Sequence, residues 1–228
     1  IMNIGVIPPL AINVADGRIG AKVLFANDEF FAEKENLLKP GRGIFIEDKY
    51  TDHGKWMDGW ETRRRRTPGN DFCIIALAGR STVHAIDIDT NHFLGNHPPY
   101  ASIEGCCSSA APDESTQWNE ILPKSELAPG KQNIFEIKHK EHLTHLRLII
   151  YPDGGIARLK VYGDLFVDLF VNWSNENTNK LYDLVAIENG GKVITCNDMF
   201  FSSKDNLIMP GKGKNMGDGW ETRRKREP

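Results

Sequence analysis

The segment LRLIIYPDGGIARLKVY, residues 146–162, decides the fold class. In its first part, apolar Leu146, Leu148 and Ile150 alternate with Arg147, which is the period of a half-buried β-strand. The next residues, Pro-Asp-Gly-Gly, have the composition of a turn, and residues 156–162 supply a return strand. The segment therefore predicts a β-hairpin.

Other apolar runs in the chain show the same strand character. Residues 72–77 form a short apolar run bounded by glycine on both sides, as expected of a buried strand. Residues 83–89 end in an alternation that puts two isoleucines on one face and Asp87 and Asp89 on the other. The only helical feature is a short turn expected within residues 28–38. These patterns predict an all-β protein built as a β-sandwich.

Composition limits the classes of function. The chain has 228 residues, is 40% hydrophobic and 26% charged, and carries a formal net charge of −3, as a folded globular protein of one or two domains would. No apolar run reaches the roughly 20 residues of a membrane span, and the near-neutral charge argues against a nucleic-acid partner. Four cysteines without a C-x-x-C spacing argue against a disulfide scaffold. The expected location is the cytoplasm, with the peroxisome as the alternative.

The chain contains an internal repeat. Residues 22–43 begin KVLFANDEFF and residues 192–213 begin KVITCNDMFF, at an offset of 170. DGWETRRRRTP at residues 58–68 then matches DGWETRRKREP at residues 218–228 in nine of eleven positions, at an offset of 160. The first copy therefore holds ten extra residues, around 44–55. Two matches in the same order indicate a duplication.

The duplication predicts the domain organisation. The first copy continues well past residue 68, whereas the second reaches only residue 228, so the second repeat is expected to be incomplete. The expected parts are an N-terminal segment at 1–12, a first repeat at 13–163, a polar linker at 164–180 and the beginning of a second repeat at 181–228.

The duplicated DGWETRR motif, residues 58–64 and 218–224, is the densest polar cluster of the sequence. Arginine pairs bidentately with a carboxylate, and Asp or Glu accepts from N–H groups, so the motif suits a small ligand carrying both. The alternative is a surface loop with one buried Trp and solvated charges. The arginine runs at 63–66 and 223–226 also resemble phosphate-binding or nuclear-localisation patches, which the adjacent Trp-Glu pairs disfavour.

A second candidate site follows the predicted strand at 83–89. Asp87, Asp89 and His92 have the chemistry of ligands for a divalent metal such as Mn²⁺. The same three residues also suit acid–base work, since a His beside carboxylates titrates near neutral pH. The alternative is a polar strand face followed by an Asx turn. No H-x-x-x-H or H-E-x-x-H spacing is present, so the sequence does not establish a metal or any other cofactor.

Several motifs in fixed order resemble the allantoicase family, over residues 13–228. They are Asn36-Leu37-Leu38, WMDGWETRR (56–64), GNDF (69–72), DIDTNHFLGN (87–96), YPDGGIARL (151–159), Asp205-Asn206-Leu207 and MGDGWETRR (216–224). The resemblance implies tandem galactose-binding-like jelly-roll repeats, the second one truncated here. It also implies hydrolysis of allantoate to (S)-ureidoglycolate and urea in purine (allantoin) degradation, by a protein that is a homo-oligomer when full length.

The resemblance assigns hypothetical roles to the two clusters. The catalytic candidates are His92, Asp89, Glu61 and Asp58, with Asp89 orienting His92. The candidates for binding allantoate are Arg63, Arg64, Trp60 and Asn96, together with Asp218, Glu221, Arg223 and Arg224 of the second copy. The alternative function is a non-catalytic jelly-roll binding module, or an inactive fragment or degenerate relative of the family.

Overall fold

The computed structural model describes residues 7–167 and 181–226. The chain divides into two compact units, residues 1–164 and 165–228, which are described separately. The first half of the predicted N-terminal segment, residues 1–6, and most of the predicted linker, residues 168–180, lie outside the described residues. No helix in the described part of the chain is long and apolar enough to cross a membrane.

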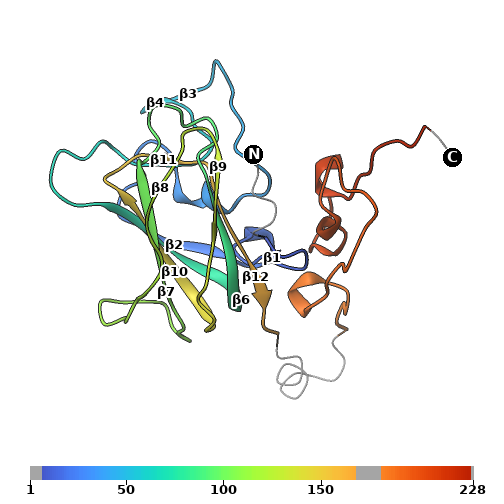
Figure 1. Cartoon of the computed structure of the whole chain (residues 1–228). Coiled ribbons are helices and arrows are strands. Elements are labelled where there is room, and N and C mark those ends of the chain that lie inside the picture. Colours follow the sequence, from blue (N-terminus) through green and yellow to red (C-terminus); the bar gives the residue numbers. More distant parts are fainter. Residues whose placement is uncertain (1–6, 168–180, 227–228) are drawn as a thin grey trace. The chain divides into compact units, whose positions relative to one another are not determined.

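The first unit consists of antiparallel strands and two short 3-10 helices, which confirms the all-β prediction (Figure 1). The helices are η1 (Gly17–Ile19) and η2 (Lys34–Leu38), and η2 is the helical turn expected within 28–38. The strands are β1 (Ile12–Asn13), β2 (Lys22–Ala26), β3 (Tyr50–Thr51), β4 (Gly54–Lys55), β5 (Trp60–Glu61), β6 (Asp71–Asp89), β7 (Tyr100–Cys106), β8 (Asn119–Glu126), β9 (Gln132–Glu136), β10 (Leu143–Tyr151), β11 (Gly155–Ile156) and β12 (Arg158–Leu165).

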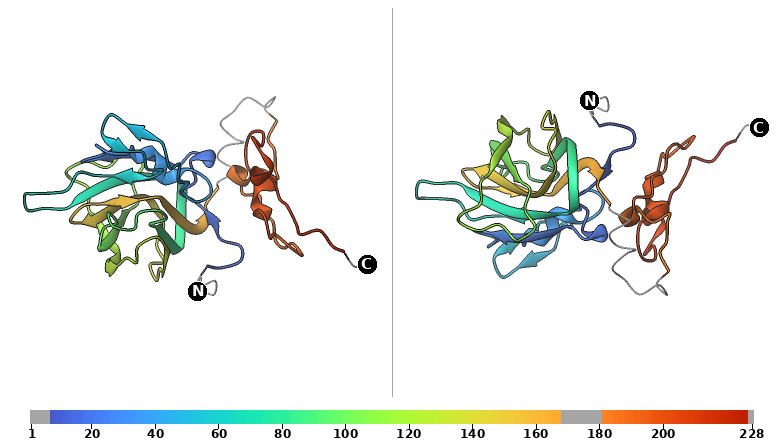
Figure 2. Two further views of the ribbon diagram at one scale, coloured as in Figure 1. Left: turned by 90° about the horizontal axis from the view of Figure 1, so that it is seen from above. Right: turned by 90° about the horizontal axis from the view of Figure 1, so that it is seen from below.

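The long strand β6 organises the jelly-roll sandwich. The sheet order is β1-β12-β6-β10-β7-β8, and β2 and β9 also pair with β6. Residues 71–76 and 81 of β6 pair with β10, and 73–76 also with β2, whereas residues 85–89 pair with β9. The two runs predicted as separate strands are thus one strand, which continues through Gly79 although its pairing with β10 shifts register between Ala76 and Ser81. Figure 2 shows β6 (turquoise) running along the first unit and then turning.

The predicted hairpin at 146–162 is wrong in its pairing, although both of its strands exist. β10 and β12 lie on opposite sides of β6 and do not pair with each other. The connecting residues do not close a tight turn, because Gly155 and Ile156 pair with Glu61 and Trp60 as strand β11. The Ala157 N–H then donates to the Asp89 carbonyl at 2.8 Å, which carries the chain across to the far half of β6.

The core lies between the layers and is filled by alternate strand residues. The fully buried large side chains are Trp60, Phe93, Leu37, Ile75, Ile86, Ile88, Ile103, Leu143, Leu146, Leu148, Ile150 and Ile156. Asp87 and Asp89 are buried as well. Both faces of the C-terminal half of β6 are therefore covered, and this strand is not the half-exposed one that its alternation suggests.

The second unit contains short 3-10 helices and no regular strand among residues 181–226. The helices are η3 (Ile187–Asn189), η4 (Lys204–Ile208) and η5 (Met216–Asp218), and an isolated bridge joins Ser202 and Glu221. The helices η3 and η4 lie 170 residues after η1 and η2, and the bridge repeats the Ala32–Glu61 bridge of the first unit. The duplicated sequence therefore adopts the same local structure twice.

Candidate functional site

The first DGWETRR motif begins as a buried strand that needs its glycine. Trp60 is fully buried, and its indole N–H donates to the Asp28 carbonyl at 2.7 Å. A Cβ on Gly59 would overlap the Ile156 carbonyl oxygen and lie 2.7 Å from the Phe93 ring. Only glycine lets β5 approach β11 this closely. Trp60 therefore holds the backbone at Asp28 in place from within the core.

The arginines that follow β5 line a cavity of about 560 Å³, which we call the arginine pocket. Arg63 Nε lies 2.6 Å from Asp28 Oδ2, and the guanidinium is 5.1 Å from the Phe30 ring centroid. Arg64 and Arg66 are exposed and form no ion pair within the described residues. The full lining is Asp28, Phe30, Phe31, Arg63, Arg64, Arg65, Arg66, Thr67 and Asp71.

Two carboxylates hold the arginines of this pocket in place. Burial acts to raise the pKa of Asp28, but hydrogen bonds from the Phe30 N–H and from Arg63 outweigh it and leave the pKa below its usual value. Asp71 is buried and accepts from Arg65 Nη1 at 2.6 Å. With Arg63 held by Asp28 and Arg65 by Asp71, the exposed Arg64 and Arg66 present further positive charge that an anionic ligand could neutralise.

Glu61 and Asn96 form a hydrogen-bonded pair outside the lining of the arginine pocket, and the N–H of the pocket residue Phe31 donates to the Glu61 carbonyl at 3.2 Å. Asn96 Nδ2 donates to Glu61 Oε1 at 2.6 Å, and the Asn96 carbonyl accepts from the Gly155 N–H at 2.8 Å. Burial raises the pKa of Glu61, and the hydrogen bond from Asn96 opposes that shift without cancelling it. Glu61 is thus a half-buried acid that holds its proton to higher pH than an exposed Glu.

Asp58 faces a buried arginine. Arg158 Nη2 lies 2.6 Å from Asp58 Oδ2, and Arg158 Nη1 donates to the Asp58 carbonyl at 3.0 Å. The same carboxylate accepts from the Ile44 N–H at 3.0 Å. Both side chains of the pair are almost completely buried. Asp58 consequently connects its own segment to the segment at residue 44 and to the start of β12.

Asp89 is engaged in the same way by Arg42. Both of its oxygens accept from the Arg42 guanidinium at 2.8 Å, and Oδ1 also accepts from the Asn91 N–H. His92 is exposed, has a φ of 68°, and stacks on Phe45 with ring centroids 5.7 Å apart. Asp89 therefore pairs with Arg42, and His92 stacks on Phe45. No hydrogen bond within the described residues joins Asp89 to His92.

Asp87 is the most unusual acid of the first unit. It is fully buried, Oδ2 accepts from Gln132 Nε2 at 2.6 Å, and Oδ1 has no partner within the described residues. Burial raises the pKa of Asp87 to about 6. Residues 7–167 and 181–226 contain no group of three or more His, Cys, Asp or Glu side chains placed to hold a metal. The candidates Asp87, Asp89 and His92 thus do not form a metal-ligand group.

The second copy reproduces the frame of the pocket with fewer contacts. The Trp220 indole donates to the Asp198 carbonyl at 2.7 Å, and Arg223 pairs with Asp198 at 3.4 Å and lies 5.1 Å from the Phe200 ring. The second-copy acids and the last arginine are half-buried or exposed: Asp218, Glu221 and Arg224. Trp220 itself is 37% exposed, compared with 0% for Trp60.

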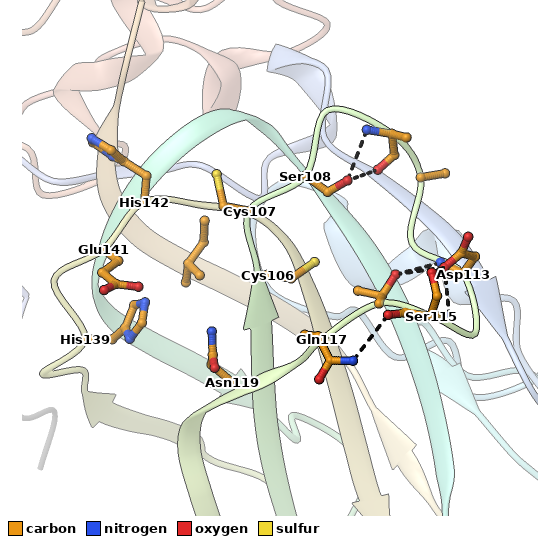
Figure 3. Close-up of a pocket in the computed structure, with 14 residues that line it drawn as sticks. Cys106, Cys107, Ser108, Asp113, Ser115, Gln117, Asn119, His139, Glu141 and His142 are labelled. Carbon is orange, nitrogen blue, oxygen red and sulfur yellow. Dashed lines mark hydrogen bonds between the residues drawn. The ribbon is translucent and has the colours of Figure 1, made fainter.

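A second cavity, of about 470 Å³, lies where β7 ends at Cys106 and β10 begins at Leu143 (Figure 3). Cys107, His139, Glu141 and His142 line one side, and the loop at 108–117 forms the other. Hydrogen bonds within the loop hold that wall, such as Ser108 Oγ to the Ala110 carbonyl at 2.9 Å. None of the residues predicted from the sequence lies there.

Comparison with known proteins identifies the family of this chain. A family model described as the allantoicase repeat matches residues 12–166 and 182–228, which is most of the chain. The chain belongs to the allantoicase family. The two matched segments correspond to the two copies of the repeat, so the family resemblance and the tandem-repeat prediction are both confirmed.

Individual members of the allantoicase family are similar along nearly the whole chain. "Probable allantoicase 2" of Burkholderia mallei is 50% identical over 218 residues, which is 95% of this chain and 64% of the relative. A crystal structure of allantoicase from Saccharomyces cerevisiae is 34% identical with a TM-score of 0.77, over 98% of this chain and 67% of that one. Another allantoicase structure is 34% identical with a TM-score of 0.78, over 96% and 65%. The chain spans slightly less than two thirds of the curated relative.

The partners that organise the site are not apparent from the local sequence. Asp28 and Phe30 hold Arg63, and Arg42 and Arg158 hold Asp89 and Asp58. A signal for the first two was present, because Asn-Asp and Phe-Phe recur at the same places in both copies of the repeat. No local signal identifies Arg158, which lies 100 residues from Asp58.

Proposed function

We propose that this protein hydrolyses allantoate to ureidoglycolate and urea, using the first copy of the DGWETRR motif. Membership of the allantoicase family supports the substrate. The observation that carries the proposal is the arginine pocket together with Glu61, whose carbonyl accepts from the N–H of the pocket residue Phe31 at 3.2 Å. The pocket offers cations for a carboxylate, and Glu61 offers an acid for a ureido group.

The reaction sets specific demands on the site. Allantoate has a carboxylate and two ureido groups on one tetrahedral carbon. Releasing urea breaks a C–N bond at that carbon, and water supplies the hydroxyl that replaces the ureido group. The departing nitrogen must gain a proton, and a base must take one from water or from the remaining ureido group. The carboxylate must be held so that the correct bond is broken.

The residues of the first unit meet these demands in different ways. Arg64, which forms no ion pair within the described residues, and Arg63, oriented by Asp28, bind the carboxylate. Glu61 has a raised pKa and is the acid that protonates the leaving nitrogen. His92 is the candidate base.

The remaining predicted residues act on this constellation indirectly. Asn96 donates to Glu61 and holds its carboxyl group in one orientation. Asp58 is bound to the buried Arg158 and Asp89 to the exposed Arg42, and their role is to fix the segments that carry Glu61 and His92. The second copy supplies a related set of residues with a more open frame.

The test is urea release from allantoate by the purified protein and by Glu61→Gln. Removing a general acid lowers turnover by about 100-fold or more, so we expect wild-type activity and a near-complete loss of kcat in Glu61→Gln. Glu114→Gln, an exposed acid in the loop of the second cavity, is the matched control and should behave as wild type. Failure of the wild-type protein to release urea would leave a binding module as its function.

A further inference from the structure

The ten residues present only in the first copy of the repeat fold back over the site. They include the small hairpin of β3 and β4, which lies at the top of the first unit in Figure 1. Its own contacts give it a defined shape. Lys55 Nζ lies 4.9 Å from the Phe45 ring and 4.8 Å from the Tyr50 ring, and Lys49 Nζ lies 3.7 Å from the Trp56 ring.

The tip of this hairpin contacts the wall of the arginine pocket. The His53 ring stacks on the Phe30 ring, with centroids 4.0 Å apart and planes 28° from parallel. Phe30 lines the pocket and also carries the Arg63 guanidinium at 5.1 Å. One aromatic ring therefore connects the hairpin tip to an arginine of the pocket.

The base of the hairpin contacts the other half of the site. Phe45 stacks on His92, and the N–H of the preceding Ile44 donates to the buried Asp58 carboxylate. The hairpin is thus fastened at its base to the loop that carries His92, while its tip reaches Phe30.

The second copy provides an internal comparison. Phe200 and Arg223 repeat the Phe30–Arg63 contact at the same 5.1 Å, and Phe200 meets Phe201 edge-on as Phe30 meets Phe31. The sequence of the second copy has no residues corresponding to the hairpin. Phe200 is 62% exposed, compared with 39% for Phe30. The copies share a pocket wall and differ in what covers it.

We infer that His53 is a positioning residue of the first copy's site, which holds Phe30 and thereby the Arg63 guanidinium in the orientation that receives the substrate carboxylate. The inference rests on the proposed function. An exposed Phe and a long Arg lose rotamer freedom when substrate binds. Stacking by His53 restricts the rotamers of Phe30 and Arg63 before substrate binds. The entropy lost when the carboxylate binds is therefore smaller, and the binding free energy is more favourable.

The experiment compares KM and kcat for allantoate in wild type, His53→Ala, His53→Phe and Asp52→Ala. A stacked ring contributes on the order of 1 kcal/mol, or about fivefold in binding. His53→Ala should therefore raise KM about 3- to 10-fold and leave kcat within about twofold. His53→Phe keeps the stacking and should restore KM. Asp52→Ala, an exposed neighbour at the tip, should match wild type, and all four should melt together.

The outcomes that overturn the inference differ from the one that overturns the proposed function. An unchanged KM in His53→Ala, or a His53→Phe variant no better than His53→Ala, would show that His53 does not position the pocket. A wild-type protein that releases no urea would refute the proposed function instead. The stacking is then judged by NMR: an upfield His53 ring signal that moves downfield in Phe30→Leu supports the contact, and an unchanged signal refutes it.

Discussion

Asp87 provides a quantitative test of the first unit's electrostatics. Its carboxyl group is fully buried on β6, with Gln132 as its described hydrogen-bond donor. Burial raises its pKa to about 6 from 3.8. Because the folded-state pKa lies above the unfolded one, the stability from this group is fully present below about pH 3.8 and is lost as the pH rises through 6.

The size of the effect follows from the two pKa values. A difference of about two units corresponds to roughly 3 kcal/mol of unfolding free energy lost by pH 8. About half of that loss has occurred at pH 5, which leaves roughly 1.5 kcal/mol between pH 5 and pH 8. Asp87→Asn removes the titration and keeps an acceptor for Gln132. The variant should therefore gain about 1.5 kcal/mol over wild type on going from pH 5 to pH 8.

The assay is urea denaturation of wild type and Asp87→Asn at both pH values. Other titrating groups act equally in the two proteins and cancel in the difference. Asp52→Asn, an exposed acid of the β3–β4 hairpin, should show no such pH-dependent gain. If the difference between Asp87→Asn and wild type is the same at pH 5 and pH 8, Asp87 does not hold a proton in the folded state and the burial argument is wrong.

Two further substitutions probe the base of the site. Asp58→Ala leaves the Arg158 guanidinium buried without its partner and should cost about 3–5 kcal/mol by denaturant titration; a loss below about 1 kcal/mol would show that the pair is hydrated. Gly59→Ala places a Cβ into the Ile156 carbonyl and should lower Tm by several degrees or prevent folding. The control is Gly219→Ala, whose Cβ meets no atom closer than 3.7 Å and which should leave Tm unchanged. Equal effects of the two substitutions on Tm would contradict the difference in packing.

Local patterns in the sequence were sufficient for the fold class and the repeat. Alternation and glycine spacing identified strands that the structure confirms, and the short helical turn within 28–38 is η2. The duplicated motif predicted a shared structure, and both copies show the same Trp-to-Asp hydrogen bond at 2.7 Å. These features depend on near neighbours, which a sequence displays directly.

Pairing between distant segments could not be predicted in this way. The PDGG sequence suggested that β10 and β12 are partners, yet β6 separates them, because Gly155 and Ile156 pair with β5. The composition of a turn indicates that the chain changes direction there. It does not indicate which strand pairs with the strand that follows the turn. The continuity of β6 through Gly79 was missed for the same reason, since the pairing of its neighbours decides it.

The acids of the site show a similar limit. Asp58, Glu61 and Asp89 were chosen by residue type, and their environments differ in ways set by residues far along the chain. Arg158 engages Asp58 and Arg42 engages Asp89, which leaves Glu61 as the acid free of a cationic partner within the described residues. Glu61 therefore remains as the candidate acid, whereas Asp58 and Asp89 have structural contacts with arginines.

The most direct test of the central claim is a crystal structure of the Glu61→Gln variant with allantoate bound. We expect the carboxylate of allantoate in the arginine pocket, in contact with Arg63 or Arg64, and a ureido nitrogen next to residue 61. Allantoate bound instead in the cavity beside Cys107 and His139, or at the second copy alone, would contradict it.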